Sequence, residues 1–207
     1  MTPNLRLRTA TRDDLETVAK VIAEVSEGVT DTLFQGVIAS MPPEKVLELV
    51  FSRSIGTYTP ENVILAEVDG RVAGLLFCYA AEAQQVPGEM RVFLKDERIR
   101  AVEPVLTAKV ENALWVNTLW VSESLRGAHL GALLIKFARK TALDRGLSAV
   151  GLFCWADNEA ARRFYLREGF VAMREIQPEE FGEGLRARHP AGGIVFSMPC
   201  RAEDAGG

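Results

Sequence analysis

The chain has 207 residues, of which 48% are hydrophobic and 25% are charged, an ordinary composition for a globular protein. This length suits one well-cored domain, which we expect to span residues 1–200 and to be followed by a disordered tail at 201–207. The net charge of -4 and a pI near 5.4 disfavour a nucleic-acid partner, because binding to a phosphate backbone draws on clustered Lys and Arg.

Cysteine usage and hydropathy bear on the cellular location. The chain has three widely spaced cysteines, Cys78, Cys154 and Cys200. An odd number at such spacing suggests neither a disulfide framework nor a thiolate metal site, so we interpret them as reduced residues that pack in the protein. The N-terminus lacks an apolar signal core, and the longest apolar run, residues 74–81, is far shorter than the roughly 20 residues of a membrane-spanning helix. We therefore expect a cytoplasmic protein with no bound metal and no membrane partner.

The first part of the chain reads as alternating strands and helices. In order, the predicted elements are a strand at residues 5–9, a helix from residue 11 that Gly28 ends, a helix at 44–53, and two strands at 62–68 and 71–79. Thr11 and Asp14 have the spacing of a capping box, and Pro42-Pro43 is typical of a helix start. Asp69-Gly70 predicts a tight antiparallel hairpin.

A long connection, residues 81–111, separates this hairpin from the next strand. Its apolar residues keep helical spacing until Pro104 interrupts them, which predicts one or two short helices. A connection of this length is typically a lid or a binding element, although it can also be a structural insertion.

Residues 114–145 predict a buried strand, a turn and a helix. The strand, 114–121, is apolar on both faces, as expected in the middle of a covered sheet. The helix begins near Leu130 and is stopped by Gly146. Free backbone N–H groups and the helix dipole favour an anion at such a helix start, although the turn matches neither a Walker A loop nor a dinucleotide GxGxxG motif.

The last part of the chain adds three strands and one helix. They are predicted as a strand at residues 149–155, a helix from Asp157 or Asn158 to Glu168, and strands at 170–175 and 193–199. The strand, helix, strand order implies a parallel pair joined by a right-handed crossover. A long loop precedes the final strand and carries Glu179, Glu180, Glu183, Arg186, Arg188 and His189.

Two spaced motifs, Arg126-Gly127-x-x-x-Gly131-Ala132 and Asn158-x-x-Ala161-x-x-x-Tyr165-x-x-x-Gly169-Phe170, resemble the GCN5-related N-acetyltransferase (GNAT) superfamily. His129 stands where that family usually has its central glycine. The resemblance implies an α/β fold, with a mixed, splayed central sheet of about seven strands flanked by helices in three α-β-α layers.

The resemblance also implies acetyl-CoA as co-substrate. Its pyrophosphate is expected on the turn at residues 125–132, and its pantetheine between strands that end near Val121 and Trp155. The cofactor-binding residues expected on this basis are Leu119, Trp120, Val121, Arg126, Gly127, Ala128, His129, Leu130, Gly131, Ala132, Asn158, Ala161 and Tyr165. Independently, Asn158, Ala161 and Tyr165 share one helical face, where an amide, a gap and a phenol can line an amide-bearing arm.

Acyl transfer from a thioester to an amine needs a neutral amine, a polarised carbonyl and a proton for the departing thiolate. Tyr165 is the expected source of that proton. The general base is not readable: Glu111 is our candidate, with Glu103, Asn117 or a base acting through water as alternatives.

The expected function is therefore N-acetyl transfer, by direct attack, to a primary amine of a small molecule or of a protein N-terminus. A non-catalytic acyl-CoA-binding or regulatory module, and a transferase of longer acyl groups, are the alternatives. The acceptor is open, because acids (Glu24, Glu27, Asp31 and those near 180) suit an ammonium group, whereas Arg186, Arg188 and His189 suit a carboxylate. Exposed strands at the sheet edge also allow a homodimer.

Overall fold

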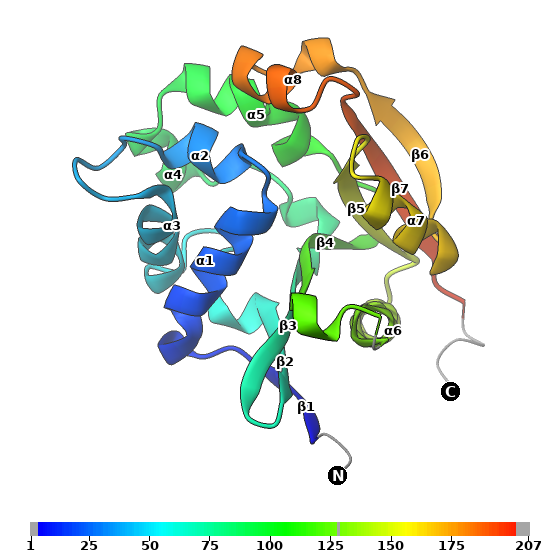
Figure 1. Ribbon diagram of the computed structural model, residues 1–207. Coiled ribbons are helices and arrows are strands. Elements are labelled where there is room, and N and C mark those ends of the chain that lie inside the picture. Colours follow the sequence, from blue (N-terminus) through cyan, green and yellow to red (C-terminus); the bar gives the residue numbers. More distant parts are fainter. Residues whose placement is uncertain (1–3, 128, 202–207) are drawn as a thin grey trace. The chain divides into compact units, whose positions relative to one another are not determined.

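The structure is a computed structural model that describes residues 4–127 and 129–201, and it contains two compact units that are described separately below. Unit 1 holds the chain up to Cys78 together with Asn117–Phe137, and unit 2 holds Tyr79–Val116 together with the chain from Ala138 onward. The strands follow the order β1-β2-β3-β4-β5-β7-β6 in a seven-stranded mixed sheet (Figure 1). The predicted fold class is confirmed.

The helices and strands occupy most of the described residues. The strands are β1 Leu5–Thr9, β2 Val63–Val68, β3 Arg71–Ala80, β4 Ala113–Val121, β5 Ala149–Trp155, β6 Val171–Ile176 and β7 Gly193–Pro199. The helices are α1 Leu15–Val25, α2 Val29–Phe34, α3 Pro43–Ser52, α4 Gly88–Phe93, α5 Asp96–Thr107, α6 Leu130–Asp144, α7 Glu159–Arg167 and α8 Glu183–Arg188.

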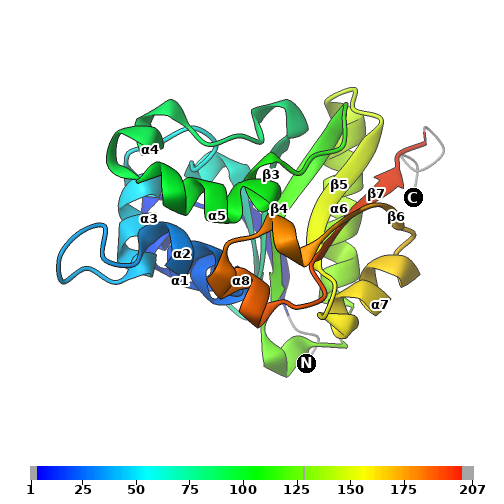
Figure 2. The same cartoon turned by 90° about the horizontal axis from the view of Figure 1, so that it is seen from above.

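Unit 1 is built around the predicted hairpin. β2 and β3 pair antiparallel through a turn in which Asp69 and Gly70 adopt positive φ of 51° and 77°, and β1 pairs antiparallel with β2. Helices α1 and α3 lie against each other on one side of these strands, and the start of α6 lies on the other (Figure 1, Figure 2). The apolar stripe of each helix therefore faces strand side chains.

Unit 2 contains the predicted parallel pair. β4 runs parallel to β5 over Ala113–Val116 and Ala149–Leu152, while β7 pairs antiparallel with both β5 and β6. Leu152 lies opposite Phe196 of β7, and the ring of Tyr165 in α7 packs near Phe196, so α7 covers this face of the strands. On the opposite face the ring of Trp155 packs on Phe181.

Two helices had not been predicted. α2 lies in a segment of mixed composition, and α8 lies in the long loop before β7; each has six residues and gives little periodic signal. In the long connection α4 and α5 confirm the expectation of one or two short helices. Pro104, however, lies inside α5, which continues to Thr107, so the proline does not end the helix although it removes one N–H from its bonding pattern. Residues 202–207 of the expected tail lie outside the described part.

An ion-pair network ties β1 to the start of α1. Arg8 donates to both carboxylate oxygens of Asp14 at 2.8 Å and to Glu67 of β2 at 2.7 Å. Asp14 also accepts from the backbone N–H and the hydroxyl of Thr11, at 2.8 and 2.9 Å, as its capping role predicts. The bonds from Arg8 hold the pKa of Asp14 well below its usual value.

Replacing Asp14 by Asn is expected to lower the free energy of unfolding at pH 7 by about 1–3 kcal/mol, because charge-assisted hydrogen bonds are lost. A depressed carboxyl pKa contributes stability above its unfolded value of about 4 that is lost as the pH falls toward the folded value. Urea denaturation between pH 7 and pH 2 should therefore show a smaller decline in the variant than in the parent. The exposed neighbour Asp13→Asn is the control; an equal pH profile for all three proteins contradicts this role.

Candidate active site

Two described residues of the turn before α6 have a left-handed backbone. Gly127 has φ of 84°, and a Cβ atom placed on it would meet nothing within 4 Å. His129 has φ of 62°, in the left-handed region, and its carbonyl accepts the N–H of Leu133 at 3.0 Å. His129 is exposed, so its side chain meets no steric obstacle from a packed interior. Histidine also adopts a left-handed backbone more readily than branched residues do. Ala128 lies outside the described residues.

The start of α6 has the features of an anion site. The helix runs for 15 residues, and Gly131 and Ala132 in its first turn are small and half-buried. Arg126 forms an ion pair with Glu123 at 3.2 Å, in which the two side chains are 64% and 86% exposed. Such an exposed pair contributes little stability, so the guanidinium can exchange this carboxylate for a phosphate.

The end of β4 leads directly into this turn. Leu119, Trp120 and Val121 are half-buried, and the N–H of Ser122 donates to the carbonyl of Ala73 in β3 at 2.9 Å. That bond fixes the end of the strand within unit 1. The three residues therefore hold an ordered backbone just ahead of the turn, as their predicted cofactor role requires.

In unit 2 the predicted motif begins at a helix cap. The side-chain oxygen of Asn158 accepts the N–H of Ala161 at 3.1 Å, which confirms the predicted N-cap of α7. Arg162 donates to the carbonyl of Ala156 at 2.9 Å and holds the preceding turn. Asn158 and Ala161 are thus fixed at the start of α7, one face of which they share with Tyr165.

Tyr165 is buried, with 9% of its surface exposed, against the rings of Phe170 at 5.5 Å and Phe196 at 6.2 Å between centroids. Burial raises the pKa of its hydroxyl above the usual value, with a further contribution from Cys154. Within the described residues this hydroxyl makes no hydrogen bond. The phenol is therefore protonated at neutral pH, with its proton not committed to a protein acceptor.

Glu111 lies elsewhere in unit 2. It is exposed in the turn before β4, which begins beside the amino end of β5 at Ala149. Trp155 and Asn158 follow the carboxyl end of β5, about 20 Å along the strand at about 3.3 Å per residue. The structure does not bring Glu111 to this end, so its position gives no support to the role of general base.

His189 also differs from its predicted setting. As a loop residue it was an expected carboxylate-binding side chain, but it is 3% exposed and packs on Trp155, whereas Arg186 and Arg188 are exposed. A buried ring cannot present itself to a solvent anion as those two arginines do.

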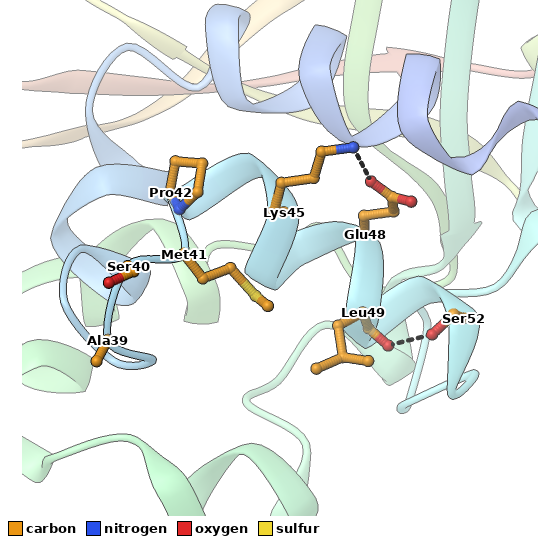
Figure 3. A pocket seen from close by; sticks show the side chains of 8 residues that line it. All are labelled: Ala39, Ser40, Met41, Pro42, Lys45, Glu48, Leu49 and Ser52. Atoms are coloured by element: carbon orange, nitrogen blue, oxygen red, sulfur yellow. Dashed lines mark hydrogen bonds and ion pairs between the residues drawn. The ribbon is translucent and has the colours of Figure 1, made fainter.

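A surface hollow of about 440 Å³ lies on α3 and the loop before it, away from all the predicted cofactor residues of unit 1. Figure 3 shows its lining, in which Lys45 reaches Glu48 at 2.9 Å and the hydroxyl of Ser52 donates to the carbonyl of Leu49. Lys45 also pairs with Glu16 at 2.8 Å. The charge of Lys45 is thus neutralised by these two carboxylates. The residues that line the hollow include no group suited to acyl transfer.

Comparisons with known proteins agree with this geometry. The sequence profile of the Acetyltransferase (GNAT) family matches residues 38–170, more than half of the chain. The chain belongs to this family and is an acyltransferase.

Relatives in sequence and in structure cover nearly the whole chain. An uncharacterized N-acetyltransferase of Archaeoglobus fulgidus is 25% identical over 87% of this chain and 99% of its own. An N-acetyltransferase structure from Staphylococcus aureus Mu50 has a TM-score of 0.65 at 15% identity, covering 93% and 100%. The NatC complex bound to Gag peptide and CoA contains a chain with a TM-score of 0.56 at 13% identity, covering 96% and 99%. These two structural likenesses concern the fold.

No helix in residues 4–127 and 129–201 is both long and apolar enough to cross a membrane.

The left-handed backbone at His129 predicts an order of tolerated residues. His129→Gly should leave the free energy of unfolding unchanged or raise it by up to about 1 kcal/mol, since glycine adopts this φ without strain. His129→Val should lower it by about 1–2 kcal/mol, because a branched Cβ crowds the backbone in this region. Urea denaturation measures both; a valine variant as stable as the glycine variant contradicts the assigned conformation.

Proposed function

We propose that this protein transfers the acetyl group of acetyl-CoA directly to a primary amine of a small molecule or of a protein N-terminus. The observation that carries this proposal is Tyr165, a buried phenol without a hydrogen-bond partner in the described residues, on a helix capped by Asn158 in a GNAT-family chain. Family membership favours this catalytic function over a module that only binds acyl-CoA.

The cofactor is bound, in this proposal, through its two polar parts. The pyrophosphate is held by backbone N–H groups at the start of α6 and by Arg126, while Gly127 and Gly131 allow close approach. The pantetheine amides are proposed to bond to backbone groups of Leu119, Trp120 and Val121. Asn158 and Ala161 are the further residues that the family motif assigns to the pantetheine arm. Because His129 is exposed, its imidazole is proposed to contact a phosphate oxygen rather than to block the turn.

The transfer step uses the lone pair of a neutral amine. The nitrogen attacks the thioester carbonyl carbon and forms the C–N bond, and the C–S bond then breaks. The departing thiolate takes the Tyr165 hydroxyl proton, and the nitrogen loses one proton to water or to a base. The raised pKa of Tyr165 keeps the hydroxyl protonated before the step and favours its reprotonation afterwards. Because the same shift opposes donation, the proton passes directly to the sulfur as the C–S bond breaks.

The acceptor is proposed as an amine because the relative from Archaeoglobus fulgidus, which covers most of this chain, is named an N-acetyltransferase. A peptide acceptor is one alternative that the structural neighbour illustrates, because the NatC complex is bound to both a Gag peptide and CoA. The exposed Arg186 and Arg188 favour an acceptor that carries a carboxylate as well as the amine. A transferase of longer acyl groups is the alternative that acyl-CoAs of increasing length test directly.

Replacing Tyr165 by Phe is expected to reduce kcat by about 10²–10³-fold, the range of a lost general acid, with a change of less than about threefold in the Kd for CoA. Thiol release with acetyl-CoA and a panel of amines gives kcat, and calorimetric titration gives Kd. Phe164→Leu, on the half-buried neighbouring residue, is the matched control.

The outcomes separate the proposed function from its alternatives. Tight CoA binding by the unsubstituted protein without turnover on any amine would support a binding module instead. Equal losses in kcat and in CoA affinity for Tyr165→Phe would show that the phenol binds the cofactor and is not the acid.

A further inference from the structure

His189 is buried against the carboxyl end of β5. Its imidazole stacks on the indole of Trp155, with ring centroids 3.8 Å apart and planes inclined by 5°. Trp155 in turn packs against Phe153 at 4.9 Å and Phe181 at 5.0 Å. A histidine in this position belongs to the packed face of the strand rather than to the loop surface.

The same imidazole bonds to the turn that follows β5. Its Nδ1 lies 3.1 Å from each carboxylate oxygen of Asp157, whose side chain is 32% exposed. Because a carboxylate only accepts, Nδ1 carries the proton and donates. Asp157 immediately precedes Asn158, the cap of α7.

Backbone bonds close this contact into a ring. The N–H of Gly192 donates to the carbonyl of His189 at 3.0 Å, and the N–H of Ala156 donates to the carbonyl of Gly192 at 2.9 Å. We refer to His189, Gly192, Ala156 and Asp157 as the clasp. Two turns that are more than 30 residues apart in sequence are thereby held at both their backbones and their side chains.

The clasp lies directly before the start of α7. β5 runs into Trp155, the clasp holds Ala156 and Asp157, and Asn158 then caps the helix that carries Tyr165. The other bonds of this turn, from Arg162 to Ala156 and from Asn158 to Trp155, come from the turn and helix themselves. His189, by contrast, belongs to the connection between β6 and β7, so its bond to Asp157 joins the turn to a segment distant in sequence.

We propose that His189 is a positioning residue, which fixes the β5–α7 turn through Asp157 and so holds Asn158 and Tyr165 in their working places. The catalytic part of this inference rests on the proposed function. Its structural part, the anchoring of the start of α7, does not.

The test uses the full-length protein. Its substitutions separate the stacking of the His189 ring on Trp155 from the hydrogen bond that Nδ1 donates to Asp157. His189→Phe keeps a ring stacked on Trp155 but removes the donor, whereas His189→Asn supplies an amide N–H near the place of Nδ1 without the ring. Asp157→Ala removes the acceptor. Ala187→Ser, on an exposed residue of α8, is the control.

Hydrogen exchange measured by mass spectrometry is the first readout. Exchange in residues 158–162 should accelerate about tenfold or more in His189→Phe and Asp157→Ala, and no further in the double variant, because both remove one interaction. His189→Asn should restore most of the protection. Unchanged exchange in His189→Phe, or independent additive effects of the two substitutions, would overturn the proposal.

Kinetics with acetyl-CoA is the second readout. His189→Phe should reduce kcat by about tenfold to hundredfold through displacement of Tyr165, with a smaller rise in the KM for acetyl-CoA, and His189→Asn should recover most of the loss. An Asn variant as impaired as the Phe variant refutes the positioning role of the donor. Absence of turnover in the unsubstituted protein counts against the proposed function alone, because the exchange comparison does not depend on activity.

Discussion

The alternation of side chains along β5 is the constraint on which the chemistry of unit 2 depends. Successive residues of a strand point to opposite faces, so Leu152 and Cys154 face one way and Phe153 and Trp155 the other. α7 covers the first face with Tyr165, and the segment before β7 covers the second with Phe181 and His189. The end of one strand thus determines both the packing of Tyr165 and the stacking of His189.

Close packing on the second face explains one residue of β7. Gly193 pairs with Trp155 in register, and a Cβ atom placed on it would lie 2.2 Å from the ring of Phe153. A larger residue would have to displace that ring, which packs edge-on against Trp155. The glycine therefore allows an aromatic layer on which His189 can stack, and it does so at the residue next to Gly192 of the clasp.

Most of the fold was predictable because its elements are long or strictly periodic. The hairpin at Asp69-Gly70, the apolar strand 114–121 and the helix capped by Asn158 each carry a local signal, and each is present. α2 and α8 are too short to show periodicity, and α5 continues past Pro104, a residue that more often ends or kinks a helix. Local signals thus predicted elements well and their exact ends less well.

The site was predictable only where its residues are neighbours in sequence. The face shared by Asn158, Ala161 and Tyr165 follows from helical spacing, but the pairing of His189 with Asp157 joins residues 32 positions apart and left no pattern to read. The same reason explains why His189 resembled a surface residue beside Arg186 and Arg188. Its burial depends on Trp155, whose orientation is decided by strand register and not by the composition of the loop.

The ring of Tyr165 is buried, but its hydroxyl oxygen is not among the buried polar atoms without a partner in the described residues, so it keeps access to solvent. Phenylalanine would fill the same space between Phe170 and Phe196 as the tyrosine ring does. Packing alone therefore does not account for tyrosine at position 165. A hydroxyl on a ring held by a capped helix can instead bond to a group that arrives with the substrate, as the proposed transfer of its proton to the departing thiolate requires.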